Sequence, residues 1–156
     1  MELPETLVKI LERRGLGADY VVDVILKSIN ADPEDYSAAH AELAIKMFKE
    51  GVRFLEENNI IQASEKLYKA IEETIKALAI AKNLEEAKIA LDKGRWTVSL
   101  LDKAARKLGD IIWRAWTEAY FLHVNGFHET RIDIDDVKAR LKFIENAINK
   151  LNLRDQ

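Results

Sequence analysis

Histidine is the side chain that changes charge most readily near neutral pH, and two of the three histidines lie close together in this sequence. His123 and His128 fall in a stretch rich in aromatic residues. His123 follows earlier apolar residues at helical spacing, so we expect its ring to point inward. There it is either a core histidine satisfied by one hydrogen bond, the interpretation we favour, or a buried general base of the kind that cleaves RNA. The weak catalytic candidates are His123, His128 and Arg131.

A metal centre is not expected from this pattern. His123 and His128 are five residues apart, a spacing that a continuous α-helix does not align on one face. The sequence has no cysteine and no Glu-x-x-His or His-Glu-x-x-His motif. We therefore predict no metal and no cofactor. His128, Glu129 and Arg131 are expected to hold a corner before the last helix by local hydrogen bonds and charge pairing.

A second group of candidates lies in a predicted helix at about 60–82. Glu65, Lys66, Tyr68 and Lys69 share its polar side, where Glu65 and Lys69 stand at the favourable i,i+4 spacing. Two interpretations are open. The group is a solvated face with salt bridges, the usual outcome of such patterns, or a polar binding surface on which Tyr68 supplies contact area.

These residues need helices to position them, and the sequence predicts only helices. Apolar residues recur with a helical period in segments joined by short connections, which favours an antiparallel multi-helix bundle. Residues 110–124 are apolar almost all round and are predicted to be central, with Asn125-Gly126 as a break. We expect one domain, residues 1–156, with a helical hairpin at 1–31 and the main bundle at 32–156. The predicted helices are 4–14, 19–30, 33–57, 60–82, 84–92, 96–108, 110–124 and one that starts after Asp133 or Asp135.

Composition narrows the function classes. Charged residues make up 33% of the chain but the net charge is only −3, which argues against a general nucleic-acid binder. The absence of cysteine and of a signal peptide or membrane-spanning run predicts a cytoplasmic protein without membrane contact. Many Glu, Lys and Arg with few loop residues are typical of thermophile proteins.

Several strings resemble the archaeal PaREP family. They are Ala63-Ser64-Glu65-Lys66-Leu67-Tyr68-Lys69-Ala70, Leu101-Asp102-Lys103-Ala104-Ala105 after Trp96, and Leu122-His123-Val124-Asn125-Gly126-Phe127-His128-Glu129 after Trp116. The resemblance covers nearly the whole chain. It implies a bundle similar to the HEPN type, whose members commonly dimerise. Some of those are metal-independent ribonucleases, and others are partner or substrate-binding subunits of nucleotidyltransferases.

In the ribonuclease branch of that wider group, an arginine is followed by four to six intervening residues and then the histidine. Here Arg114, the nearest arginine before His123, is separated from it by eight residues, so no catalytic residue is carried over. We therefore expect a non-catalytic helical protein-interaction module that forms a homodimer. The alternatives are a HEPN-like RNA-binding or ribonuclease protein and a nucleotidyltransferase subunit.

Overall fold

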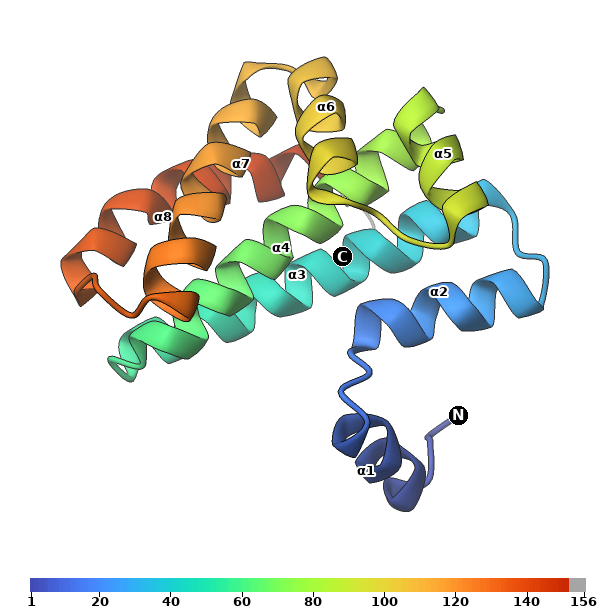
Figure 1. Cartoon of the computed structure of the whole chain (residues 1–156), viewed down its shortest axis with the longest axis horizontal. Coiled ribbons are helices and arrows are strands. Elements are labelled where there is room, and N and C mark those ends of the chain that lie inside the picture. Colours follow the sequence, from blue (N-terminus) through green and yellow to red (C-terminus); the bar gives the residue numbers. More distant parts are fainter. Residues whose placement is uncertain (152–156) are drawn as a thin grey trace.

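The computed structural model describes residues 1–151, and all the regular elements in this part of the chain are helices (Figure 1). This confirms the predicted all-α bundle. A π-helical turn, η1 (His123–His128), continues α7, and a short 3-10 turn, η2 (Asn149–Leu151), follows α8. The α-helices are α1 (Glu5–Arg13), α2 (Ala18–Ser28), α3 (Pro33–Glu56), α4 (Ile60–Ala81), α5 (Glu85–Lys93), α6 (Val98–Leu108), α7 (Asp110–Leu122) and α8 (Ile134–Ile148).

The long helices α3 and α4 lie side by side and form the frame of the bundle (Figure 1). Their connection is short because Asn58 adopts φ 58° and the Asn59 side chain accepts a hydrogen bond from the Gln62 backbone N–H at 3.1 Å. Gly51 allows the two helices to approach closely. A Cβ atom at this position would lie 2.8 Å from Cδ2 of Leu67, closer than packed carbon atoms tolerate.

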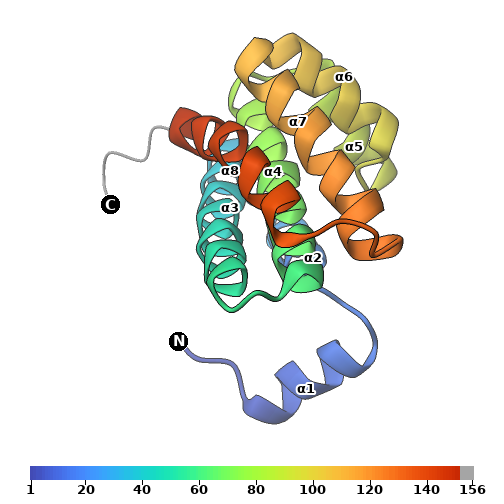
Figure 2. The ribbon, with the colours of Figure 1, turned by 90° about the vertical axis from the view of Figure 1, so that its left-hand side faces the viewer.

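The central helix is α4, which contacts α3, α5, α6, α7, α8 and η1. Its inward side is fully buried, as Leu67, Ala70 and Ile71 illustrate. The prediction that 110–124 would be central was wrong, because α7 buries one face only and leaves Ile111 43% exposed. Figure 2 shows α3 on one side of α4 and α6 and α7 on the other.

The C-terminal helices are locked by polar contacts at their ends and crossings. Trp116 Nε1–H on α7 donates to Asp102 Oδ1 on α6 at 3.0 Å. Asp133 caps α8: its side chain accepts from the Asp136 backbone N–H at 3.1 Å, and the Asp136 side chain accepts from the Asp133 backbone N–H at 3.0 Å. Asp133, rather than Asp135, is therefore the cap.

The two N-terminal helices differ from the rest of the bundle because neither contains a buried residue. Helix α2 packs on α3, whereas α1 lies below the bundle in Figure 1. Large apolar side chains are exposed on both helices and on the residues that flank them: Leu3, Leu7, Val8, Tyr20, Val24, Ile25 and Ile29. None of the helices in residues 1–151 has the length and apolar character needed to cross a membrane.

Candidate functional site

His123 lies where the end of α7 crosses the first turns of α4. Its Nδ1 is 3.0 Å from Glu65 Oε1, and its ring stacks on that of Tyr68 with 4.0 Å between centroids and 20° between planes. The His123 side chain is 21% exposed and that of Glu65 is 15% exposed. One turn of α4 therefore supplies both a hydrogen-bond acceptor and a stacking surface that fix the orientation of the His123 ring.

His128 completes the group by a contact that the sequence analysis did not expect. Nε2 of His128 is 3.1 Å from Nε2 of His123, and the two rings are nearly perpendicular with centroids 4.4 Å apart. The expectation that five-residue spacing would keep these rings apart was wrong, because residues 123–128 form a π-helical turn, in which hydrogen bonds run from i to i+5. We call Glu65, Tyr68, His123 and His128 the histidine cluster.

The π-turn also corrects the prediction of a break at Asn125-Gly126. Gly126 is buried against α4, where a Cβ atom would lie 2.1 Å from Ser64 Oγ, so the glycine serves close approach rather than a chain break. The backbone N–H of Glu129 donates to the carbonyl of Val124 at 2.9 Å and closes the wide turn. The turn thus rests on α4 directly beside Glu65.

Arg131 acts on the loop rather than on the histidines. Its Nε–H donates to Asn125 Oδ1 at 2.7 Å, and Asn125 Nδ2–H donates to the carbonyl of Phe121 at 3.0 Å. This chain of hydrogen bonds holds the residues that follow the π-turn against the end of α7, in the corner where local hydrogen bonding was expected. The Arg131 side chain is exposed, as is that of His128.

The four candidate binding residues of α4 do not share one surface. Glu65 and Tyr68 join the histidine cluster, whereas Lys66 Nζ pairs with Glu50 Oε2 of α3 at 3.1 Å. Tyr68 is only 6% exposed, and burial, followed by the charges of Glu72 and Glu65, raises the pKa of its hydroxyl. Tyr68 therefore contributes a neutral ring beneath His123. Lys69 is partly buried. Burial raises the pKa of Asp19, but the charges of Lys76 and Lys69 outweigh it and lower the value.

A second polar group, which sequence reasoning missed, lies where α2 covers α3 and α4. His40 is 1% exposed and contacts Glu73 Oε1 at 2.9 Å and Asp23 Oδ1 at 2.7 Å. Lys76 Nζ lies 2.9 Å from Glu73 Oε2 and 3.8 Å from Asp19 Oδ2. We call these five residues the buried charge cluster. The sequence offered one indication of this cluster, the i,i+3 spacing of Glu73 and Lys76, and the same spacing also occurs on helix faces that are exposed to solvent.

The electrostatics of the buried charge cluster favour charged forms of both cations. Burial lowers the pKa of His40, but the hydrogen bonds and charges of Asp23 and Glu73 outweigh it and raise the value to about 9. Burial likewise lowers the pKa of Lys76, while Glu73 and Glu72 raise it, so the net shift is upward. For Glu72 itself, burial raises the pKa to about 7.

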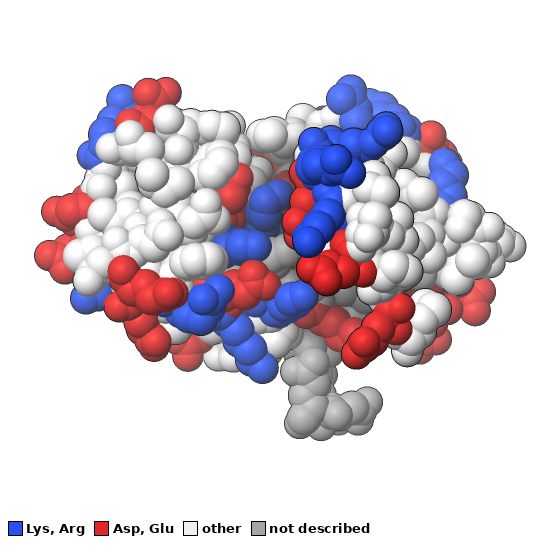
Figure 3. All heavy atoms as spheres, turned by 90° about the horizontal axis from the view of Figure 1, so that it is seen from below, with Lys and Arg blue, Asp and Glu red and all other residues white. Residues whose placement is uncertain are grey.

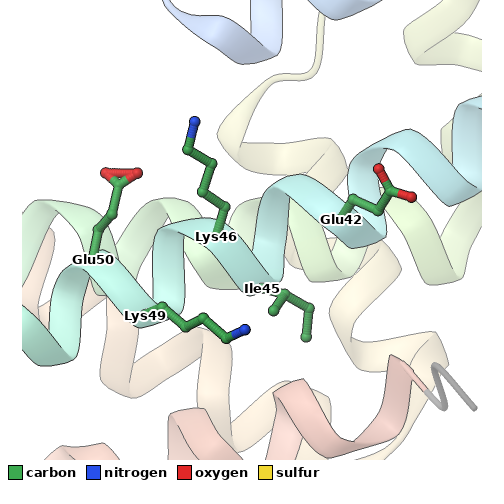
Figure 4. Close-up of a pocket in the computed structure, with 5 residues that line it drawn as sticks. All are labelled: Glu42, Ile45, Lys46, Lys49 and Glu50. Carbon is green, nitrogen blue, oxygen red and sulfur yellow. The ribbon is translucent and has the colours of Figure 1, made fainter. Parts of the chain in front are cut away.

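Two other features of the surface are less specific. A hollow on α3 is lined by Glu42, Ile45, Lys46, Lys49 and Glu50, whose side chains point to different sides of the helix (Figure 4). The face in Figure 3 mixes acidic and basic side chains, and a group of basic side chains borders its central hollow. Within residues 1–151, no group of three or more His, Cys, Asp or Glu side chains is placed to hold a metal ion.

Comparison with known proteins identifies the family of this chain. The model of the archaeal PaREP1/PaREP8 family matches residues 39–148. A crystal structure from Sulfolobus solfataricus, the structural-genomics target SsR10, is 35% identical, with a TM-score of 0.64, over 70% of this chain and 92% of that one. The solution structure of target SsR10 is 36% identical, with a TM-score of 0.61, over 69% and 87% of the two chains. No curated protein matches. This chain belongs to the archaeal PaREP1/PaREP8 family.

Proposed function

We propose that this chain is a non-catalytic helical protein-interaction module that forms a homodimer through α1 and α2. The observation that carries the proposal is the uncovered apolar face of each N-terminal helix. Leu7 is 39%, Val24 47% and Ile29 66% exposed, although all three stand at positions where a helix would pack on a neighbour. Exposed apolar side chains gathered on successive helices are the kind of surface that marks interaction sites.

The charge pattern of α1 suits pairing with a second copy. Its first turn carries Glu5 and its last turn carries Arg13. In an antiparallel pair related by a two-fold axis, each acidic first turn meets a basic last turn, and the same apolar face is used twice. The family-model match begins at residue 39, so both helices precede the part of the chain shared with the family model.

Size-exclusion chromatography with light scattering tests this proposal. We expect the intact chain to be a dimer and Leu7→Glu to be a monomer, because the substitution places a charge in the apolar face. Leu91→Glu is a matched control, since Leu91 is 51% exposed on α5 and lies outside the proposed interface. A monomeric intact chain at every concentration would overturn the proposal. So would a Leu7→Glu variant that stays dimeric.

A second candidate function, an RNA-binding or RNA-cleaving protein of HEPN type, is favoured by the histidine cluster alone. The Nε2 atoms of His123 and His128 lie 3.1 Å apart, both side chains reach the surface, and the Arg131 cation lies in the following loop. One histidine could act as general base while Arg131 stabilises phosphate charge. Labelled RNA incubated with the intact chain, His123→Ala and His128→Ala in the presence of EDTA tests it. RNA left intact and unbound by the unsubstituted protein rules this candidate out.

A further inference from the structure

The distance between the two imidazole nitrogens of the histidine cluster is close to that required at a metal ion. Nitrogens bound to one tetrahedral Zn²⁺ at about 2.0–2.1 Å lie roughly 3.3 Å apart. Nε2 of His123 and Nε2 of His128 are already 3.1 Å apart. We propose that His123 and His128 bind a divalent transition-metal ion, such as Zn²⁺, through these two atoms.

Glu65 prepares His123 for this role. The carboxylate of Glu65 faces Nδ1 at 3.0 Å, so the hydrogen-bond network assigns the ring proton to Nδ1 and leaves the lone pair on Nε2, directed toward His128. Metal-binding histidines almost always donate their other N–H to a carboxylate or carbonyl in this way. The carboxylate fixes the tautomer that a metal ion requires.

The position of the His123 ring is fixed before any ion arrives. Tyr68 stacks on it at 4.0 Å, and Phe127 lies nearly parallel to it with centroids 6.1 Å apart. Because Tyr68 is buried, its ring cannot move aside without disturbing the core. The ion therefore has to order only the exposed His128 side chain, which keeps the entropic cost of binding small.

The contact between the two histidines also implies a change of tautomer at His128 when an ion binds. With the His123 lone pair on Nε2, the 3.1 Å contact requires His128 Nε2–H to donate to it. When the ion binds, Nε2 of His128 gives up this proton while Nδ1 takes one up from solvent, so both Nε2 atoms coordinate through lone pairs. The neutral His128 ring keeps one proton throughout, and no other protein group takes part.

The coordination sphere would be open. Glu65 faces the other nitrogen of His123, and residues 1–151 hold no set of three His, Cys, Asp or Glu placed to share an ion, so the ion would complete its sphere with water or another small ligand. Open positions are a feature of catalytic rather than structural zinc sites, and imidazole ligands suit Zn²⁺, Cu²⁺ and Ni²⁺. The site is independent of α1 and α2 and so does not rest on the proposed dimer.

The test uses full-length protein without a histidine tag, titrated with Zn²⁺ and followed by calorimetry and by imidazole ¹⁵N NMR. We expect one Zn²⁺ per chain and shifts of the Nε2 signals of His123 and His128. His40 is an internal reference, because it is 1% exposed and both its nitrogens contact carboxylates. Its signals should not move.

Three variants make the result specific. His128→Ala removes an exposed ligand and should weaken Zn²⁺ binding by at least about tenfold. Glu65→Gln keeps the size of the side chain but removes its charge, and we expect a loss of about 10–100-fold. Glu145→Gln, an exposed carboxylate on α8, is the control and should bind as the unsubstituted chain does. The proposal is overturned if Nε2 signals stay unmoved or if His128→Ala binds Zn²⁺ as tightly as Glu145→Gln.

Discussion

His40 and His123 both contact a glutamate of α4, yet the second ring nitrogen of each faces a different kind of group. His40 contacts Glu73 and, on the other side, Asp23. His123 contacts Glu65 and, on the other side, His128. Two carboxylates favour a protonated ring, which serves as a buried cation. One carboxylate and one imidazole leave the second nitrogen of His123 facing a group that can itself bind a metal ion. The partner of the second nitrogen thus separates a structural histidine from a candidate ligand.

The same substitution at both sites should give the largest contrast. We expect His40→Phe to lower the free energy of unfolding by about 3–5 kcal/mol, because removing one member of a buried charge group leaves the others uncompensated. His123→Phe should cost no more than about 1 kcal/mol, since Glu65 is partly exposed and can be hydrated. Urea denaturation measures both. Equal losses at the two positions would break the distinction.

The pH dependence of stability should follow His40. Its folded-state pKa of about 9 lies above the ordinary 6.5, so its stabilising contribution is complete below pH 6.5 and disappears as pH rises through 9. The shift corresponds to about 3 kcal/mol. The pKa of Glu72 is raised to about 7, so its protonated form also stabilises the fold, and this contribution is lost as pH rises through 7.

This expectation is checked by urea denaturation between about pH 5 and about pH 9.5, together with an NMR titration of the histidine rings. The free energy of unfolding should fall across the range. An increase in stability toward pH 9 would contradict the electrostatic account of the buried charge cluster, and so would a His40 ring that deprotonates below pH 7.

A smaller effect is expected at the support of the histidine cluster. Gly126→Ala places a methyl group against Ser64 and should lower the free energy of unfolding by about 1–3 kcal/mol. Ser64→Gly removes the opposing side chain, so Gly126→Ala should cost less in that background. A double-mutant cycle measures the coupling. Additive losses would mean that the π-turn does not depend on this close approach.

Much of the fold could be predicted from the sequence, because amphipathic spacing directly reflects which helix faces are buried. The central place of α4 was harder to predict. Part of its charged side is covered by other helices, but its sequence pattern is the same as that of a helix whose charged side faces solvent. Glu73 and Lys76 show the difficulty: their spacing suits solvent, but both are buried, and Lys76 faces Asp19 of α2. Nothing in a single sequence states that a remote helix supplies Asp19 and Asp23.

The histidine cluster was predicted in its parts and missed as a whole. Glu65, Tyr68, His123 and His128 were all candidates, but on separate surfaces. Glu65 and His123 are 58 residues apart, and only the crossing of α4 and α7 brings them together. The π-turn, the second missing step, leaves no periodic trace in a segment of six residues.

The π-turn also makes the path of the chain after α7 sensitive to single-residue insertions and deletions. It accommodates one residue more than the same stretch of α-helix would, and each helical residue turns the chain by about 100°. Deleting Val124 would leave the two histidines four residues apart, a spacing that ordinary α-helical winding keeps on one face, but it would redirect the loop that leads into α8. A frame-preserving loss of one codon would therefore alter the path of the final helix while the two histidines stay neighbours.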